Sequence, residues 1–152
     1  MDKTILKPEC VFEQFARINE IPRPSKREEK MIDYLVAWGR EHGLETESDK
    51  TGNVIIRKPA TPGMENKKTL ILQSHMDMVC EKRADVEHDF TKDGLKLSVQ
   101  DGYISANGTT LGGDNGIAVA YGLALLESTD IPHPALEVVI TVEIRKQTNI
   151  YS

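Results

Sequence analysis

Apolar residues recur every three or four positions in two segments near the start of the chain. In the first segment, between residues 8 and 19, they are Val11, Phe12, Phe15 and Ile18. In the second segment they are Met31, Ile32, Leu35, Val36 and Trp38. This spacing places each set on one face of a helix, so two amphipathic helices are predicted. The sequence Ser25-Lys-Arg-Glu28 has the form of a capping box, which predicts that the second helix begins there.

Shorter apolar stretches bounded by turn residues predict strands. They cover residues 44–48, 53–58, 70–72, 95–99, 103–104 and 136–142. Two turn sequences, Asp49-Lys-Thr-Gly52 and Asp101-Gly102, join neighbouring stretches and predict hairpins. Strands that alternate with long helices indicate an α/β domain, with a mixed sheet flanked by helices.

A third helix is predicted from residue 114 to residue 126, where almost every side chain is apolar. Such a helix must be covered on both sides. We expect part of this helix, or an edge strand at 136–142, to be exposed or covered by another copy of the chain. Because an exposed apolar patch drives association, a homo-oligomer is expected.

Composition narrows the class of protein. The 152 residues suffice for one domain with a core, and 39% hydrophobic with 28% charged residues is typical of a soluble globular protein. The net charge of −5 offers no basic surface for nucleic acid. No apolar run is long enough to cross a bilayer and the start lacks a signal peptide's apolar core, so we expect no membrane partner and a cytoplasmic location. The two cysteines, Cys10 and Cys80, form neither a disulfide framework nor a zinc ribbon.

Candidate chemistry begins where the apolar stretch at 70–72 gives way to His75-Met-Asp77. Residues at i and i+2 of a strand point to the same side, so His75 and Asp77 are expected to share one cleft. A neutral imidazole can hold a metal with one nitrogen while a carboxylate orients the ring through the other. Taken alone, the pair could also be a strand that merely ends in polar residues.

The second candidate is Asp114, in the sequence Gly108-Thr-Thr-Leu-Gly-Gly-Asp114-Asn-Gly116 at the start of the third helix. Its carboxylate could cap the helix, because a short side-chain oxygen satisfies the first free amides. It could instead bridge two cations, and the two roles are compatible. The surrounding glycines indicate that backbone comes close to something at this point.

These two blocks, His75-Met-Asp77-Met-Val-Cys-Glu-Lys82 and Gly108 to Gly116, resemble the signature blocks of the Xaa-His dipeptidases, which are di-zinc metallopeptidases related to peptidase T and the carnosinases. Ile21-Pro-Arg-Pro-Ser25 is similar to that family's N-terminal segment. The resemblance implies that residues 1–142 form the N-terminal part of a zinc-peptidase catalytic domain. It implies that His75 binds zinc, that Asp114 bridges two zinc ions, and that Asp77 supports His75 as part of the catalytic machinery.

The same resemblance implies hydrolysis of a dipeptide that ends in histidine, with a metal-bound water as the attacking group. In the family, two adjacent glutamates follow the last strand, one as general base and one as metal ligand. Aligned on the strand at 136–142, they fall on Ile144 and Arg145, while Glu143 lies one position early and on the opposite face. Residues 143–152 therefore look like a divergent tail, as from a truncated or out-of-frame gene. We expect the catalytic domain to be incomplete and the chain alone to be inactive.

Three alternatives stay open. The chain could belong with a related aminoacylase or carboxypeptidase, it could be a binding module or fold remnant that has lost its site, or its true gene product could be longer. Four further residues carry weaker expectations. His42, His88 and His133 are expected to be solvated, and Arg23 to contact substrate or to form a surface ion pair.

Overall fold

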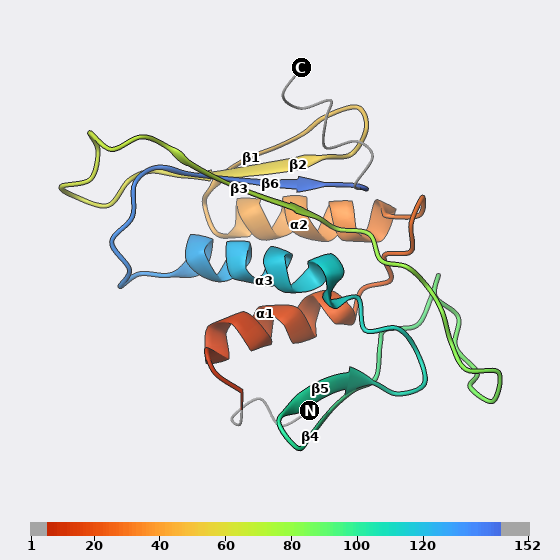
Figure 1. Ribbon diagram of the computed structural model, residues 1–152. Helices are drawn as coiled ribbons and strands as arrows, with labels where there is room; N and C mark the ends of the chain where they lie inside the picture. Colours follow the sequence, from red (N-terminus) through yellow and green to blue (C-terminus); the bar gives the residue numbers. More distant parts are fainter. Residues whose placement is uncertain (1–5, 144–152) are drawn as a thin grey trace.

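One four-stranded sheet and three helices form the body of the protein (Figure 1), and the computed structural model describes residues 6–143. The helices are α1 (Glu9–Asn19), α2 (Glu29–Glu41) and α3 (Gly113–Glu127). The strands are β1 (Glu45–Ser48), β2 (Val54–Lys58), β3 (Leu70–His75), β4 (Leu97–Gln100), β5 (Tyr103–Ala106) and β6 (Leu136–Thr141). Each of the predicted helices, strands and hairpins is present, with bounds that shift by a few residues at most.

The sheet is mixed, as predicted. Its strands run in the order β1-β2-β6-β3. Strand β2 is antiparallel to both β1 and β6, and β3 is parallel to β6. The parallel pair aligns His75 at the end of β3 with Thr141 at the end of β6. The carboxyl ends of these two strands therefore meet at the same edge of the sheet, where ligands commonly bind in α/β proteins.

The expectation that the last strand lies at an edge is wrong. Strand β6 lies between β2 and β3, and most of its residues are buried. Its run of apolar residues suits this central position, and order along the chain does not fix order in the sheet. Among the described strands, β1 and β3 form the two edges.

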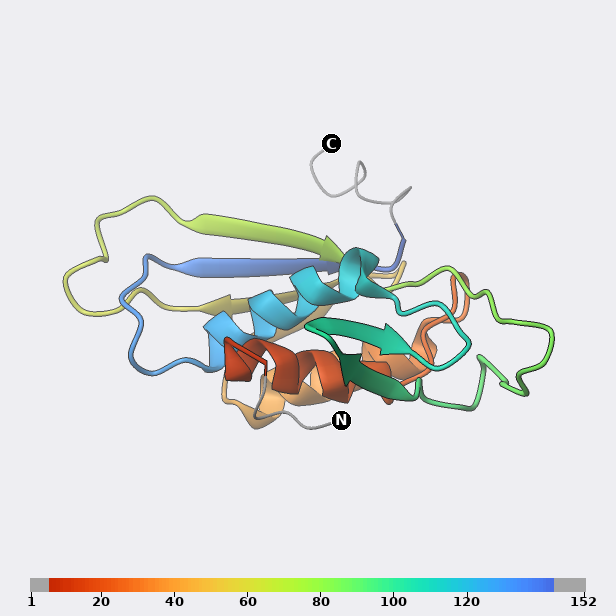
Figure 2. The same cartoon turned by 60° about the horizontal axis from the view of Figure 1, so that its bottom comes forward.

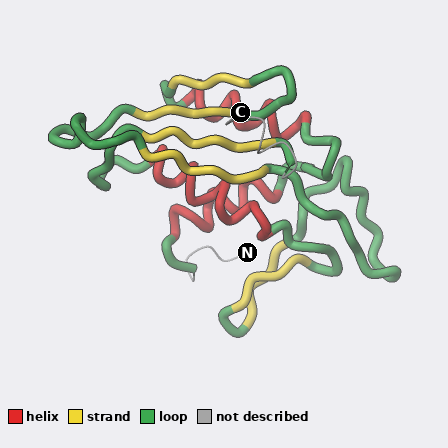
Figure 3. The backbone as a smooth tube through the Cα atoms, turned by 45° about the horizontal axis from the view of Figure 1, so that its top comes forward, coloured by secondary structure: helices red, strands yellow, loops and turns green. Residues whose placement is uncertain are grey.

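All three helices lie on one side of the sheet (Figure 3). Helix α2 packs beneath β1 and β2, α3 packs beneath β3 and β6, and α1 packs against α3 (Figure 1). The core between them is formed by fully buried side chains, among them Phe15, Leu35, Ile56, Leu123 and Ile140. Helix α3 is thus covered on two sides, and only part of it, including the half-exposed Tyr121, is open to solvent, as expected.

The β4–β5 hairpin forms a separate two-stranded sheet beside α1 (Figure 2). It is tied to the end of that helix by the Leu95 N–H, which donates to the Asn19 carbonyl at 2.8 Å. None of the helices in the described part of the chain is both long enough and apolar enough to span a membrane.

The predicted capping box at Ser25-Lys-Arg-Glu28 is not formed. Helix α2 begins at Glu29, with Glu28 as its N-cap and no side-chain capping bond. Lys26 has a φ of 73°, so residues 25–28 turn instead of starting the helix. The Ser25 hydroxyl is used elsewhere, because it donates to the carboxylate of Asp77.

Candidate functional site

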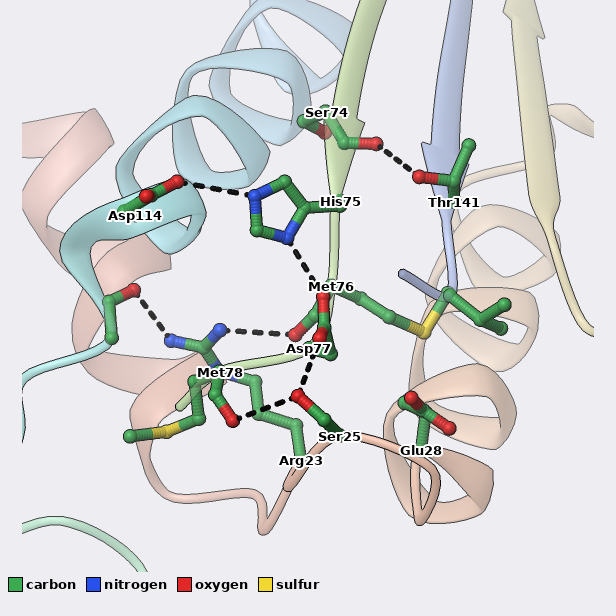
Figure 4. A network of polar contacts seen from close by, with 12 residues as sticks. Arg23, Ser25, Glu28, Ser74, His75, Met76, Asp77, Met78, Asp114 and Thr141 are labelled. Atoms are coloured by element: carbon green, nitrogen blue, oxygen red, sulfur yellow. Dashed lines mark hydrogen bonds and ion pairs between the residues drawn. The ribbon is translucent and has the colours of Figure 1, made fainter. Parts of the chain in front are cut away.

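His75 and Asp77 lie together where strand β3 ends (Figure 4). His75 Nδ1 is 2.8 Å from Asp77 Oδ1, and the two side chains are 12% and 13% exposed. Because a carboxylate accepts, this contact is satisfied when Nδ1 carries the proton and donates. The other ring nitrogen, Nε2, then presents its lone pair away from Asp77. The prediction that the side chains of His75 and Asp77 point to the same side is confirmed.

Asp114 approaches the same imidazole from the start of α3. Its Oδ1 is 3.1 Å from His75 Nε2, and its side chain is 95% exposed. The backbone at Asp114 is not helical, with φ −93° and ψ 104°, and the helix N-cap is Gly112 with no side-chain capping bond. The alternative in which Asp114 caps the helix is therefore not borne out. Its carboxylate faces the ring of His75 instead of the first free amides.

A fourth residue, Ser25, extends this line of contacts. Its hydroxyl donates to Asp77 Oδ2 at 2.5 Å, and lies 3.3 Å from the Met78 carbonyl oxygen (Figure 4). Asp77 thus accepts one bond on each carboxylate oxygen, from Ser25 and from His75. Sequence reasoning assigned Ser25 to a capping box and missed this role. Only the proximity of segment 23–25 to Met78, through a parallel bridge between Pro24 and Met78, brings the hydroxyl here.

Arg23 does not form a surface ion pair, so that expectation for it is wrong. Its side chain is buried beneath the site, with the residue 2% exposed. Burial lowers the pKa of the guanidinium to about 10, while the nearby Asp77 acts in the opposite direction. The group therefore stays charged at neutral pH.

Glu143 follows the end of β6 and lies near Glu28, at the start of α2. Glu143 lines a cavity of about 280 Å³ together with Thr51 of the β1–β2 turn and with residues of α2 and the turn before it, namely Lys26, Glu28, Glu29 and Ile32. Burial is the main cause that raises the pKa of Glu28, and the charges of Asp77 and Glu143 act in the same direction. Ile144 and Arg145, where the family's glutamate pair was expected to align, lie outside the described residues.

The structure also tests the expectation for His133. His133 is buried, with Nδ1 2.6 Å from the Pro134 carbonyl oxygen, so the expectation that it is solvated is wrong. Its backbone carbonyl accepts from the N–H and the hydroxyl of Thr61, and its N–H donates to the same hydroxyl. Within residues 6–143, no group of three or more His, Cys, Asp and Glu side chains is arranged to hold a metal ion. His75 and Asp114 therefore offer two converging donors.

Known proteins resemble the chain over nearly all of its length. No protein-family model matches the sequence. The cytosol non-specific dipeptidase of Escherichia coli K12 is 47% identical over 137 residues, which is 90% of this chain and 28% of that protein. The crystal structure of aminoacylhistidine dipeptidase from Vibrio alginolyticus matches with a TM-score of 0.91 and 46% identity, over 95% of this chain and 29% of the other.

A more distant structure, aminopeptidase PepT from Bacillus cereus, matches with a TM-score of 0.64 and 27% identity, over 87% of this chain and 35% of the other. The chain thus spans about a third or less of the length of each of these proteins. The resemblance read from the sequence blocks is confirmed, as is the α/β fold that it implied. In sequence and in fold, this chain is similar to the dipeptidases of Escherichia coli and Vibrio alginolyticus, aligned along nearly its whole length with less than a third of theirs.

Proposed function

We propose that His75 and Asp114 bind a metal ion and that they form part of the site of a zinc dipeptidase. The observation that carries this proposal is the pair of carboxylates on the two nitrogens of one imidazole. With the Nδ1 proton donated to Asp77, the Nε2 lone pair faces Asp114 Oδ1 at 3.1 Å, and both are acceptors. Two acceptors that face each other need a proton or a cation between them. Imidazole nitrogen and carboxylate oxygen are ordinary zinc ligands.

Each contacting residue has a part in this proposed site. Asp77 would hold the tautomer that leaves Nε2 free, as carboxylates do for metal-bound histidines. Ser25 would hold the second oxygen of Asp77 and so fix its rotation. Asp114, with its exposed carboxylate, would reach the metal from the side of α3. When bound, zinc ions lower the pKa of a water molecule and polarise the scissile carbonyl; two ions are proposed for the whole site.

The substrate class follows from the relatives. One is named a dipeptidase and another an aminoacylhistidine dipeptidase, so we propose a dipeptide substrate, with C-terminal histidine as the preferred form. These names favour a dipeptidase over the related aminoacylases and carboxypeptidases. A cytosolic location is proposed from the name of the Escherichia coli relative. We propose further that residues 1–142 correspond to the N-terminal part of the catalytic domain.

A second candidate function is metal binding, or simply folding, without catalysis. Two observations favour it for this chain alone. Positions 144 and 145, where a general base and a further ligand would align, hold isoleucine and arginine. A closed zinc site needs about four ligands, and two converge here. We therefore propose weak zinc binding by this chain and no detectable turnover.

The test separates the two candidates. Zinc affinity is measured by calorimetry, and hydrolysis by release of histidine from dipeptides that end in histidine. The metal proposal requires weaker zinc binding in His75→Ala and in Asp114→Ala, with wild-type binding in His42→Ala, which removes an exposed histidine at the end of α2. Unchanged zinc binding in His75→Ala and Asp114→Ala would contradict the metal proposal. Turnover that depends on His75 would rule out the non-catalytic candidate.

A further inference from the structure

The guanidinium of Arg23 joins three separate segments beneath the site. Nη1 donates to the Met76 carbonyl oxygen at 3.0 Å, and Nη2 donates to the Gly112 carbonyl oxygen at 2.9 Å. Nη2 also donates to Asn19 Oδ1 at 2.9 Å. Figure 4 shows the planar group between the chain that leaves β3 and the chain that enters α3.

Two of these acceptors belong to the segments that carry the proposed metal donors. Met76 lies between His75 and Asp77, and Gly112 lies two residues before Asp114. These segments are far apart in the sequence, and Arg23 binds the backbone of both through one rigid group. The backbone of Arg23 adds a further tie, because its carbonyl accepts from the Met78 N–H at 3.0 Å.

The glycines around Asp114 make room for this group. A Cβ atom at Gly112 would lie 2.4 Å from Arg23 Nη2, and one at Gly116 would lie 2.6 Å from it. At Gly113, in contrast, the nearest atom to an added Cβ is a Leu111 methyl carbon at 4.0 Å. The close approach that the glycines indicated in the sequence is therefore an approach to Arg23. The position of the Arg23 guanidinium therefore requires glycine at 112 and 116, but not at 113.

Arginine suits this place better than lysine. Its fork of fixed N–H donors reaches three acceptors in different directions, whereas a lysine ammonium is a point charge on a flexible stem. Bonds from a charged donor to carbonyl oxygens are stronger than neutral ones, and they offset the cost of burying the charge. A lysine at position 23 would keep the positive charge but could not make all three of these hydrogen bonds.

We infer that Arg23 is a positioning residue, whose guanidinium clamps the His75–Asp77 segment to the segment that carries Asp114 and so sets the approach of His75 Nε2 to Asp114. This positioning role concerns the proposed metal site and rests on the proposed function. Its geometry can be tested without any metal.

The experiment uses two variants and two matched controls in the full chain. Arg23→Lys removes the fork and keeps the charge, and Gly116→Ala displaces the guanidinium without removing it. Arg57→Lys alters an arginine on the sheet that pairs with Glu45, Glu47 and Glu137, and Gly113→Ala adds a methyl group where there is space. Cooperative thermal unfolding first shows which variants fold.

Three readouts then follow. Amide hydrogen exchange reports local opening, the ¹⁵N resonances of the His75 ring report which nitrogen carries a proton, and titration with Co²⁺ reports the metal site. In both variants we expect exchange about tenfold faster at residues 75–78 and 110–116, altered His75 ring resonances, and Co²⁺ affinity lower by about tenfold. Both controls should keep wild-type values in all three measurements.

The other possible results each contradict either the clamp or the proposed metal function. Wild-type exchange and wild-type ring resonances in both variants would overturn the clamp. If both variants fail to unfold cooperatively while the controls fold, Arg23 serves general stability and the positioning inference falls. If wild type takes up no Co²⁺ but the two metal-free readouts change as expected, the clamp stands and the proposed metal function fails.

Discussion

His75 Nε2 and Asp114 Oδ1 lie 3.1 Å apart, although the two residues are 39 positions apart in the sequence. The imidazole is therefore placed between Asp114 on one nitrogen and Asp77 on the other. Neither carboxylate can donate when ionised, so both compete for protons on one ring. A cation bound by His75 Nε2 and Asp114 would leave the single ring proton on Nδ1 for Asp77. The first prediction therefore concerns a substitution of Asp77.

Replacing Asp77 by asparagine should weaken metal binding. Asparagine keeps the size of the side chain but removes its charge and offers an amide that can donate to Nδ1, so the ring can adopt the tautomer in which Nε2 is protonated. Loss of such a supporting carboxylate typically lowers metal affinity by about 10- to 100-fold. Titration with Zn²⁺ checks this, with Asp101→Asn in the β4–β5 turn as the control. If the Asp77→Asn variant binds Zn²⁺ as tightly as wild type, Asp77 has no role in metal binding.

Removing the Ser25 hydroxyl should have a smaller effect in the same direction. Ser25→Ala leaves Asp77 Oδ2 without its 2.5 Å donor, so the carboxylate gains rotational freedom but keeps its charge and its contact with His75. A hydrogen bond to a charged group typically contributes about 1.5–3 kcal/mol, and we expect part of this to be lost because water replaces the hydroxyl at an exposed residue. Urea unfolding and Zn²⁺ titration measure both consequences. Ser98→Ala, in the exposed hairpin, is the control, and equal effects in the two variants would contradict the role given to Ser25.

The contrast between Asp77 and Ser25 shows which parts of the site the sequence could reveal. The contact between His75 and Asp77 is local, because residues two apart at a strand end face the same side whatever the rest of the fold does. The contacts of Ser25 with Asp77 and of Arg23 with Gly112 join residues 52 and 89 positions apart. No periodicity encodes such pairs. Ser25 also matched a local pattern, the capping box, that the tertiary contact then overrode.

The same distinction applies to the fold. Helices α1 and α2 and both hairpins follow from spacing and turn residues, and all are present. The position of β6 in the centre of the sheet depends on a crossover from β3 through α3, which the order of elements does not determine. Asp114 was placed in the site by its resemblance to a family, since its own local pattern favoured a helix cap that is not formed.

Glu28 should make stability depend on pH. Burial, with the charges of Asp77 and Glu143, raises its pKa in the folded state above the ordinary value, while the N–H of Lys26 acts against this. Between the unfolded and the raised folded pKa, the folded state binds more protons, so the free energy of unfolding falls as pH rises through that window. Above the window the full penalty of the buried charge remains.

Glu28→Gln removes this titration, so its stability relative to wild type should increase as the pH rises from the ordinary glutamate pKa through the raised one. Urea unfolding at a series of pH values gives the difference between the two proteins. Glu65→Gln, at a glutamate that accepts the Gly63 N–H on the surface, should show no such trend. A difference between Glu28→Gln and wild type that stays constant with pH would show that the Glu28 pKa is not raised.

The free edge of β3 should drive self-association. Within the described part of the chain, no strand pairs with its outer side, and Ile71 on this strand is 47% exposed. An edge strand with apolar side chains and unpaired backbone groups is a template for another chain, and a lysine on such an edge blocks pairing. We therefore expect Ile71→Lys to shift the chain towards monomer in sedimentation at micromolar concentration. Ile131→Lys changes an isoleucine that is 44% exposed in the loop before β6, and it should leave association as in wild type. A wild-type chain that is monomeric at every concentration would show that this edge is already protected.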